Sequence, residues 1–563
     1  MNALVLIAAA IVSLDGLWDF RLEKDRSLEE VALPGFVPND KMVVPGSWDS
    51  TSHYYNQRGT GCYRRSFDLA HDIENGFLVV DGCCLRSRYW IDGREIGFSK
   101  LPWSRFEFAT GLLKKGPHEI VAAVDSVVDN AKVKLFRNFY DFYAPGGFHH
   151  GVWLETQENA VEPRRIVVRT RDFTKGEIEV EVEGVNGQRT LVFDGQSEVK
   201  VTFANGKAVV RVPNFKLWSP ETPNLHKVSL SASSLLLSAR FGIRQVGTAD
   251  GRITLNGRPV YLKGVNRHEL HYEFGATTPL QLMYEDIKNV KDLGGNFIRG
   301  SHYAQSDDFL TLCDELGVMV WEESLGWGNG KEQLEDAEFC DLQERQTRLM
   351  ARNSINHPCI IISGFLNEPD STLPACKALV DRLIAALRAE DTGHLITFAC
   401  NRNAKDIAHA NTDIIAYNAY PCWYSWELQT GTNREMHDNI RKCHEEIIRY
   451  FRGKYKDERP IIVSETGVKA DYGARDPRGG AQYTEDFQAE YEKAMLEELF
   501  ALKDIAGVAI WQFTDAKTYT RTKGLRNRSY GVNTGGLYDL YRRPKLVVEE
   551  VRKAFQGTKG ECK

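Results

Sequence analysis

Two acidic side chains stand at the ends of strongly apolar stretches of this sequence. Glu368 ends "IIISGFLNE" and Glu465 ends "PIIVSE". Each apolar run predicts a buried strand, so the carboxylate at its end should lie where the strand leaves the core. Two carboxylates on either side of a glycosidic bond suffice to hydrolyse it, because one protonates the leaving oxygen while the other attacks the anomeric carbon or activates water.

The elements that must position these carboxylates are strands that alternate with amphipathic helices from about residue 251 onward. This alternation predicts parallel strands joined by crossover helices, and eight such units in about 310 residues predict a (β/α)₈ barrel. The expected strands are Val260–Asn266, Asn296–Ser301, Val318–Glu323, Ile360–Leu366, Leu395–Ala399, Ile414–Asn418, Pro460–Ser464 and Gly507–Phe513.

In such a barrel the chemistry lies at the C-terminal ends of the strands, so Glu368 and Glu465 should meet at one mouth although 465 − 368 = 97 positions separate them. Other carboxylates, Glu322, Glu323 and Asp515, also stand near strand ends. Position alone therefore leaves a catalytic pair and ordinary rim carboxylates both open.

The first 250 residues have a different texture. Short runs of alternating apolar and polar residues, such as "EIEVEVEG" and "KAVVRVPN", predict antiparallel β structure. The texture changes near Glu162–Pro163. We therefore expect three domains: a β-sandwich over 1–160, a smaller β-sandwich over 161–250 and the barrel over 251–563.

Composition excludes several classes of partner. The formal net charge of −6 over 563 residues argues against nucleic acid or an anionic membrane surface as a partner. The eleven cysteines are scattered, several of them in apolar runs, which favours a reducing compartment, and we expect a cytoplasmic protein. The apolar start "MNALVLIAAAIV" lacks a basic segment before it, so a cleaved signal is the less favoured interpretation.

Long motifs in the barrel region resemble glycoside hydrolase family 2, and within it the β-glucuronidase branch. They are "GVNRHE" (264–269), "GGNFIRGSHYAQSDDFLTLCDELGVMVWEE" (294–323), "RNSINHPCIIISGFLNEP" (352–369), "IAYNAYPCWYSWELQTG" (415–431), "PIIVSETG" (460–467) and "AIWQFTD" (509–515). Upstream, "LDGLWDF" (14–20) and "NFYDFYAPGGFHHGVWLE" (138–155) resemble the family's jelly-roll domain, so the likeness covers nearly the whole chain.

The resemblance implies a retaining exo-β-glycosidase built from a jelly-roll sandwich, an immunoglobulin-like sandwich and a catalytic barrel. It places the acid/base on Glu368 and the nucleophile on Glu465. It implies a glycoside substrate and no cofactor, and it is compatible with a homo-oligomer. Some family galactosidases bind Mg²⁺ beside the acid, but the expected histidine is absent from "NEPDSTLPAC", so we predict no metal.

The resemblance also implies a set of substrate-binding residues: Asn367, Asp141, His268, His302, Tyr420, Tyr424, Trp511, Arg526, Arg528 and Asn533. Asn367 precedes the acid and would reach the sugar 2-hydroxyl, one of the two tyrosines would hydrogen-bond the nucleophile, and Trp511 would form the pocket floor. Each has a plain structural alternative. His268 and His302 could be packing residues, Asp141 could cap a turn, and Arg528 could belong to a solvated loop.

The sequence departs from the β-glucuronidase pattern at one position. That branch binds the substrate carboxylate with Asn-x-Lys after strand eight, and here Asn533 is followed by Gly535 where the lysine should stand. Arg526 and Arg528 are the expected replacements, since an arginine grips a carboxylate with two parallel hydrogen bonds.

Several substrates therefore remain open at this stage. Glucuronide and galacturonide have equal standing, because the altered anion site also fits an axial 4-hydroxyl. A neutral β-galactoside is the next alternative. A non-catalytic carbohydrate-binding protein is disfavoured, because both carboxylates are present.

Overall fold

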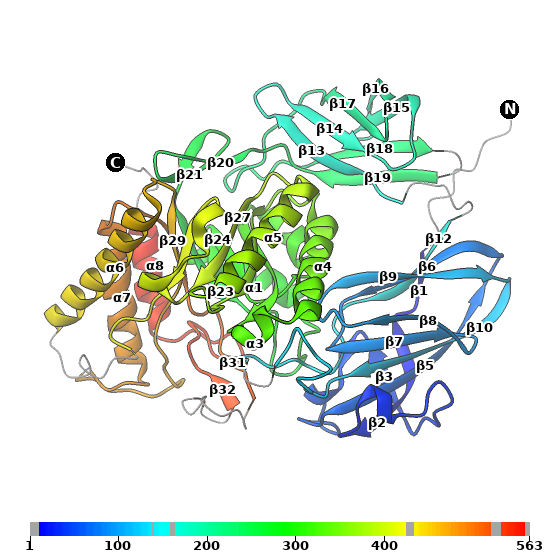
Figure 1. Cartoon of the computed structure of the whole chain (residues 1–563), viewed down its shortest axis with the longest axis horizontal. Coiled ribbons are helices and arrows are strands. Elements are labelled where there is room, and N and C mark those ends of the chain that lie inside the picture. Colours follow the sequence, from blue (N-terminus) through cyan, green and yellow to red (C-terminus); the bar gives the residue numbers. More distant parts are fainter. Residues whose placement is uncertain are drawn as a thin grey trace.

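A computed structural model describes residues 11–137, 140–157, 164–232, 235–423, 433–478, 480–519, 528 and 531–557. Figure 1 shows an N-terminal β region in blue, a second β region in cyan and green, and a barrel that runs from green to red. The fold class predicted from the sequence, two β-sandwiches followed by a (β/α)₈ barrel, is confirmed.

The N-terminal region is a sandwich of two antiparallel sheets, with strand orders β1-β12-β6-β9 and β3-β2-β5-β10-β7-β8. The alternating residues of both sheets bury large aromatic side chains between them, among them Trp18, Tyr63 and Tyr89, all fully buried. The strands are β1 (Ile11–Ser13), β2 (Gly16–Lys24), β3 (Asp40–Val44), β4 (Gly46–Ser47), β5 (Gly59–Leu69), β6 (Ile73–Asp81), β7 (Arg86–Ile91), β8 (Arg94–Ser99), β9 (Arg105–Leu113), β10 (Gly116–Asp125), β11 (Gly147–Phe148) and β12 (Val152–Gln157).

The second region is a smaller sandwich of a three-stranded sheet, β13-β14-β17, and a four-stranded sheet, β16-β15-β18-β19. Ile178, Val180, Leu191 and Leu230 fill the space between the two sheets. The strands are β13 (Val167–Asp172), β14 (Glu177–Glu181), β15 (Gly187–Phe193), β16 (Ser197–Phe203), β17 (Lys207–Arg211), β18 (His226–Ala232) and β19 (Leu235–Phe241).

A small antiparallel sheet of β20 (Val246–Ala249), β21 (Arg252–Leu255) and β22 (Arg258–Val260) leads into the closed barrel. The barrel strands are β23 (Leu262–Arg267), β24 (Phe297–Gly300), β25 (Met319–Trp327), β26 (Ile360–Asn367), β27 (Leu395–Cys400), β28 (Ile415–Asn418), β29 (Ile461–Thr466) and β30 (Ile505–Ile510). All of their pairings are parallel. The eight strands predicted from the sequence are therefore all present.

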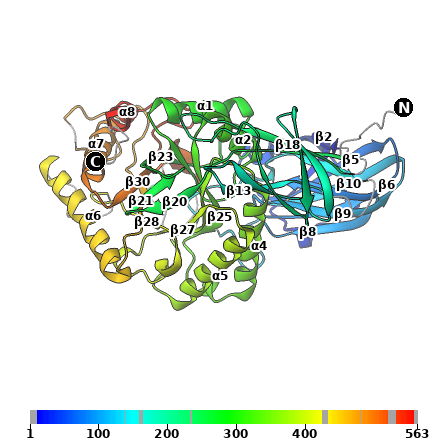
Figure 2. The same ribbon diagram turned by 90° about the horizontal axis from the view of Figure 1, so that it is seen from above.

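Helices surround the barrel strands, as the view from above shows (Figure 2). They are α1 (Leu280–Asp292), α2 (Asp307–Leu316), α3 (Lys331–Leu334), α4 (Ala337–Ser354), α5 (Pro374–Glu390), α6 (Asn433–Tyr455), α7 (Glu485–Ala501) and α8 (Val547–Gly557). None of the described helices is long and apolar enough to cross a membrane. A last pair of short strands, β31 (Ala516–Lys517) and β32 (Val532–Asn533), lies beyond β30.

Capping residues fix where the helices start and stop. The Ser306 hydroxyl accepts a hydrogen bond from the Phe309 backbone at the start of α2, and Thr484 does the same for Phe487 at the start of α7. Helix α2 ends at Gly317, whose φ of 70° is the left-handed conformation that favours glycine.

The N-terminal sandwich contacts the barrel through Trp103, which lies between β8 and β9, and through the segment between β10 and β11. The Trp103 ring stacks on the barrel residue Tyr303 at 4.5 Å between centroids, and the Phe142 ring lies 5.8 Å from that of His302. The Tyr143 backbone donates to the Lys517 carbonyl oxygen at 3.1 Å. These contacts place Asp141 at the edge of the barrel mouth.

Candidate active site

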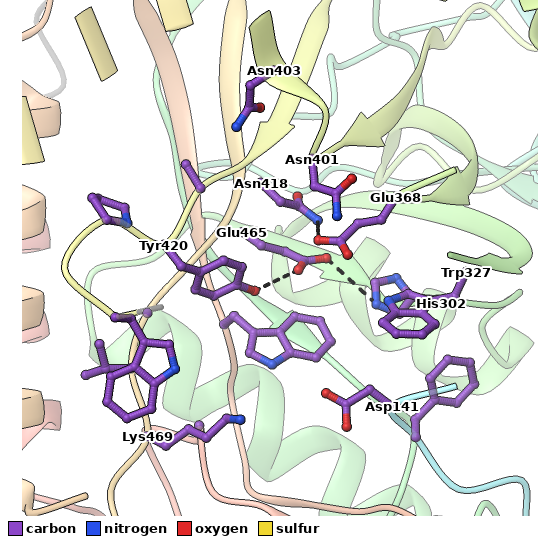
Figure 3. Close-up of a pocket in the computed structure, with 18 of the residues that line it drawn as sticks. Asp141, His302, Trp327, Glu368, Asn401, Asn403, Asn418, Tyr420, Glu465 and Lys469 are labelled. Carbon is purple, nitrogen blue, oxygen red and sulfur yellow. Dashed lines mark hydrogen bonds and ion pairs between the residues drawn. The ribbon is translucent and has the colours of Figure 1, made fainter. Parts of the chain in front are cut away.

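A cavity of about 960 Å³ opens where the barrel strands end, and both predicted catalytic carboxylates line it. Glu368 directly follows β26 and Glu465 lies near the end of β29. In Figure 3 the two carboxyl groups face each other across this cavity. The expectation that they share one mouth of the barrel agrees with this placement.

Three groups surround the Glu465 carboxylate. Arg299 on β24 donates to Oε1 at 2.7 Å, and the Tyr420 hydroxyl donates to Oε2 at 2.8 Å. His302 Nε2 lies 3.7 Å from Oε1 (Figure 3). Glu465 is only 3% exposed, so the hydrogen bonds from Arg299 and Tyr420 take the place of those from water around the carboxylate.

Glu368 lies in a different environment. Among the described residues, the amide of Asn418 donates to its Oε1 at 2.8 Å, and no cation forms an ion pair with it. Burial, and after it the charge of Glu465, raises the pKa of Glu368 to about 7. Glu368 also has a φ of 52°, in the left-handed region that a glutamate enters only when its surroundings enforce it.

Arg299 connects the two halves of the site. It is fully buried and donates to Glu323 at 2.6 Å and to the Asn367 side-chain oxygen at 3.0 Å, besides its bond to Glu465. Sequence reasoning missed this residue, because "NFIRG" reads as an ordinary buried strand. The arginine inside an otherwise apolar four-residue strand was the available signal.

Asn367 ends β26 and Asn418 ends β28, and both side chains belong to the hydrogen-bond network of Arg299. The Asn418 amide donates both to Glu368 and to the Asn367 side-chain oxygen, the latter at 3.1 Å. Asn367 itself is fully buried and does not line the cavity, and its amide nitrogen has no hydrogen-bond partner in the described parts of the chain. Asn418 ends the predicted strand "IAYN" and was missed, since a lone Asn at a strand end has many structural uses.

The two predicted histidines lie in different positions relative to the cavity. His302 lines the cavity, and its ring stacks on Trp511 at 5.3 Å between centroids. Burial and the charge of Arg299 lower the pKa of His302 to about 3, so its ring is neutral. His268 is 3% exposed, does not line the cavity and packs edge-on against Trp511 at 5.4 Å.

Three further predicted residues contact one another on the far side of the cavity from the strand-end carboxylates. Arg528 forms a two-pronged ion pair with Asp141, with Nε 2.6 Å from Oδ1. Asn533 donates to the same carboxylate at 3.2 Å. Arg528 and Asp141 line the cavity, whereas Asn533 is fully buried behind them. The sandwich and the end of the barrel chain therefore meet at this ion pair.

The last three predicted residues are Trp511, Tyr424 and Arg526. Trp511 lines the cavity just after β30 and is 8% exposed. Tyr424 and Arg526 lie outside the described residues. Lys469, four positions after Glu465 in "SETGVK", also lines the cavity and was missed, because a lysine after a strand usually belongs to a solvated loop.

One group of described residues has the chemistry of metal ligands. Atoms of Cys400, Asp406 and His409 lie within 4.8 Å of one another, and all three are buried. They do not line the cavity, and the His409 ring already contacts Asp406 at 3.1 Å and the Phe398 carbonyl at 3.1 Å. These contacts account for the cluster without an ion.

The geometry supports one class of chemistry. A carboxyl group whose pKa is near 7 can hold a proton at neutral pH, and a second carboxylate that faces it is surrounded by donors. This is the division of roles that cleavage of a glycosidic bond requires. Asn418, Tyr420 and Trp511 supply polar and aromatic walls around the two groups.

Comparisons with known proteins agree with this chemistry. The pattern of the glycosyl hydrolases family 2 TIM barrel domain matches residues 246–559, and that of a second glycosyl hydrolases family 2 domain matches residues 157–244. The chain is 27% identical to a β-glucuronidase of Chlorocebus aethiops and 26% identical to that of Homo sapiens, each over 96% of this chain and 90% of the relative.

A solved structure is similar over almost the whole chain as well. The β-galacturonidase of Eisenbergiella tayi, determined with galacturonate bound, superposes with a TM-score of 0.86 at 25% identity. The match covers 98% of each chain. The arrangement of the two sandwiches and the barrel is therefore shared with that enzyme.

Proposed function

Because the chain belongs to glycosyl hydrolase family 2, we propose that it hydrolyses terminal β-linked hexuronides, glucuronides or galacturonides, in two steps with retention of configuration. The observation that carries this proposal is the pair of unlike carboxyl groups, Glu368 and Glu465, on one cavity. The names of the relatives, β-glucuronidase and β-galacturonidase, support the choice of a hexuronide.

In the first step Glu368 acts as the acid and Glu465 as the nucleophile. The Glu368 proton passes to the glycosidic oxygen as the bond to the aglycone breaks, and Glu465 forms a covalent bond to the anomeric carbon. Arg299 and Tyr420 orient the attacking carboxylate through their hydrogen bonds to its two oxygens. The aglycone leaves with the transferred proton.

In the second step Glu368 acts as the base. Once Glu465 is esterified it carries no charge, so the second of the two causes that raise the pKa of Glu368 is lost. The ionised Glu368 then accepts a proton from water as the water attacks the anomeric carbon. The two displacements together return the β configuration.

The pH dependence should follow the protonation of Glu368. The protonated fraction falls as pH rises through the pKa of about 7, so kcat/KM for a substrate with a poor leaving group should fall about tenfold per pH unit above that value. A pH series with an alkyl hexuronide measures this. Glu368→Gln should lack the alkaline decline, and a decline that persists unchanged in that variant would assign it to another group.

Tyr420→Phe should lower kcat by about 10- to 100-fold with a small change in KM, because a hydrogen bond to a charged group contributes about 1.5–3 kcal/mol. Tyr417→Phe is the matched control. Tyr417 lies on β28, three positions before Tyr420, and its hydroxyl is hydrogen-bonded to His444 at 2.7 Å. It does not line the cavity. Equal losses in the two variants would mean that the Tyr420 hydroxyl does not assist the nucleophile.

Side-by-side rates on aryl β-glucuronide, β-galacturonide and β-galactoside test the substrate class. We expect kcat/KM for at least one uronide to exceed that for the galactoside by more than about 100-fold. An ion pair between the substrate carboxylate and a buried cation has an effect of this size. Preference for the galactoside would replace the hexuronide with a neutral sugar. No hydrolysis of any of the three would favour a carbohydrate-binding protein.

A further inference from the structure

A buried lysine, Lys469, lies in the wall of the cavity. Lys469 is 3% exposed, and within the parts of the chain that the structure describes no hydrogen-bond acceptor reaches its Nζ. Its side chain lines the cavity and points across it in the direction of Asp141 (Figure 3). A buried ammonium without an anion is costly, so a cation retained in such a place indicates that a ligand supplies the negative charge.

The other charged groups on the cavity wall are already engaged. Glu465 is paired with Arg299, and Asp141 with Arg528. Glu368 accepts from Asn418. The Arg528 guanidinium donates two hydrogen bonds to the buried Asp141 carboxylate, which balances its charge. Among the described residues of this wall, Lys469 is therefore the cation that a substrate anion would meet unpaired.

The position of Lys469 relative to Gly535 strengthens this conclusion. The Ala470 backbone donates to the Thr534 carbonyl oxygen at 3.1 Å, so the residues next to this bonded pair, Lys469 and Gly535, lie on adjacent chain segments. Both line the cavity. Position 535 is the one at which the sequence lacks the expected cation. A lysine on the neighbouring segment can thus serve the same region of the cavity.

We propose that Lys469 binds the carboxylate of the substrate and so determines the preference for hexuronides. This inference rests on the proposed function and assigns the anion site within it to a residue beyond the predicted Arg526 and Arg528. The ammonium would donate to the sugar carboxylate in a region shielded from water, where an ion pair is strong.

Lys469→Met tests the proposal, because methionine keeps most of the volume and removes the charge. The variant should lose on the order of 30- to 1,000-fold in kcat/KM for the preferred aryl uronide, as expected when one partner of a shielded charge pair is removed. The rate on the neutral methyl ester of the same uronide should change by less than about threefold. Calorimetric titration with the free hexuronic acid should show a matching loss of affinity in Lys469→Met.

A matched control removes another lysine whose ammonium group is buried. Lys517 Nζ has no hydrogen-bond partner among the described residues either. It lies over the Tyr143 ring at 4.0 Å and does not line the cavity. Lys517→Met should leave the ratio of uronide to ester rates unchanged within about twofold, since it takes no charge from the cavity wall. Thermal unfolding of each variant shows whether it is folded, and Lys469→Gln provides a second neutral side chain.

Moving the cation offers a stricter test. A Cβ at Gly535 would meet Trp511 and Asn533 at 3.3–3.4 Å, so a side chain there requires these neighbours to shift by a few tenths of an ångström. The double variant Lys469→Met/Gly535→Lys should recover at least about tenfold of the lost uronide activity if one charge serves both positions. A double variant as poor as Lys469→Met would argue against a shared anion site.

The outcomes separate the two proposals. A wild-type protein that hydrolyses no uronide contradicts the proposed function. A wild-type protein that prefers a uronide, with Lys469→Met slowing uronide and ester equally and with unchanged affinity for the free acid, leaves the function standing. That second result overturns the role of Lys469.

Discussion

Glu465→Gln should lower kcat for every glycoside substrate by a factor on the order of 10⁴ or more, the range expected when a covalent nucleophile is removed. The amide keeps the size of the side chain but cannot attack the anomeric carbon. It also replaces an acceptor oxygen beside Arg299 or Tyr420 with a donor. Steady-state assays with an aryl hexuronide measure the loss, and full activity in this variant would refute the assignment.

Glu492→Gln is a matched control for this substitution. Glu492 lies on α7, is fully buried, and burial raises its pKa to about 8, so the neutral amide resembles its protonated form. It does not line the cavity, and we expect activity within a few-fold of the wild type.

Azide should partly restore turnover in Glu465→Ala, because it can occupy the space that the missing side chain leaves. The product should then be the α-glycosyl azide. A β-azide would place the missing group elsewhere.

Glu368→Gln should have an effect that depends on the leaving group. For an alkyl hexuronide, whose leaving oxygen needs a proton, kcat/KM should fall by about 10²–10⁴-fold. For an activated aryl hexuronide such as a dinitrophenyl glycoside, the first step needs little protonation, and the loss in kcat/KM should be much smaller. The ratio of the two losses is therefore the quantity to measure.

The structure gives a physical reason for this dependence. Glu368 is half-buried, receives one neutral donor from Asn418 and has a pKa of about 7, so it carries the proton in a large fraction of molecules at neutral pH. Equal losses across leaving groups would count against an acid role. They would indicate that Glu368 positions the sugar or maintains the cavity instead.

The barrel and the two carboxylates were predictable because they depend on local patterns. The apolar run of β26 is buried at every position. The chain leaves such a strand at the barrel mouth, and Glu368 is the first residue after it. The end of strand eight was predicted less well. We expected Gly507–Phe513, whereas β30 spans Ile505–Ile510 and Trp511 already belongs to the mouth.

Pairings between distant segments could not be predicted in this way. Asp141 and Arg528 are 387 positions apart, and their ion pair depends on how the sandwich docks on the barrel. Arg299 and Lys469 are likewise defined by neighbours on other strands: one is satisfied by Glu323 and Glu465, and the other has no described partner. The sequence predicted an anion site in the arginine loop, but it could not show that the Asp141 carboxylate is already bonded to Arg528.

The central claim is that Glu465 forms a covalent bond to the sugar. A 2-deoxy-2-fluoro hexuronyl fluoride tests it, because the fluorine at C2 destabilises the transition states of both steps while the fluoride leaving group keeps the first step fast. The account predicts a stable adduct on the tryptic peptide 457–469, located on Glu465 by mass spectrometry. An adduct on a different residue, or an active enzyme that never forms one, would contradict it.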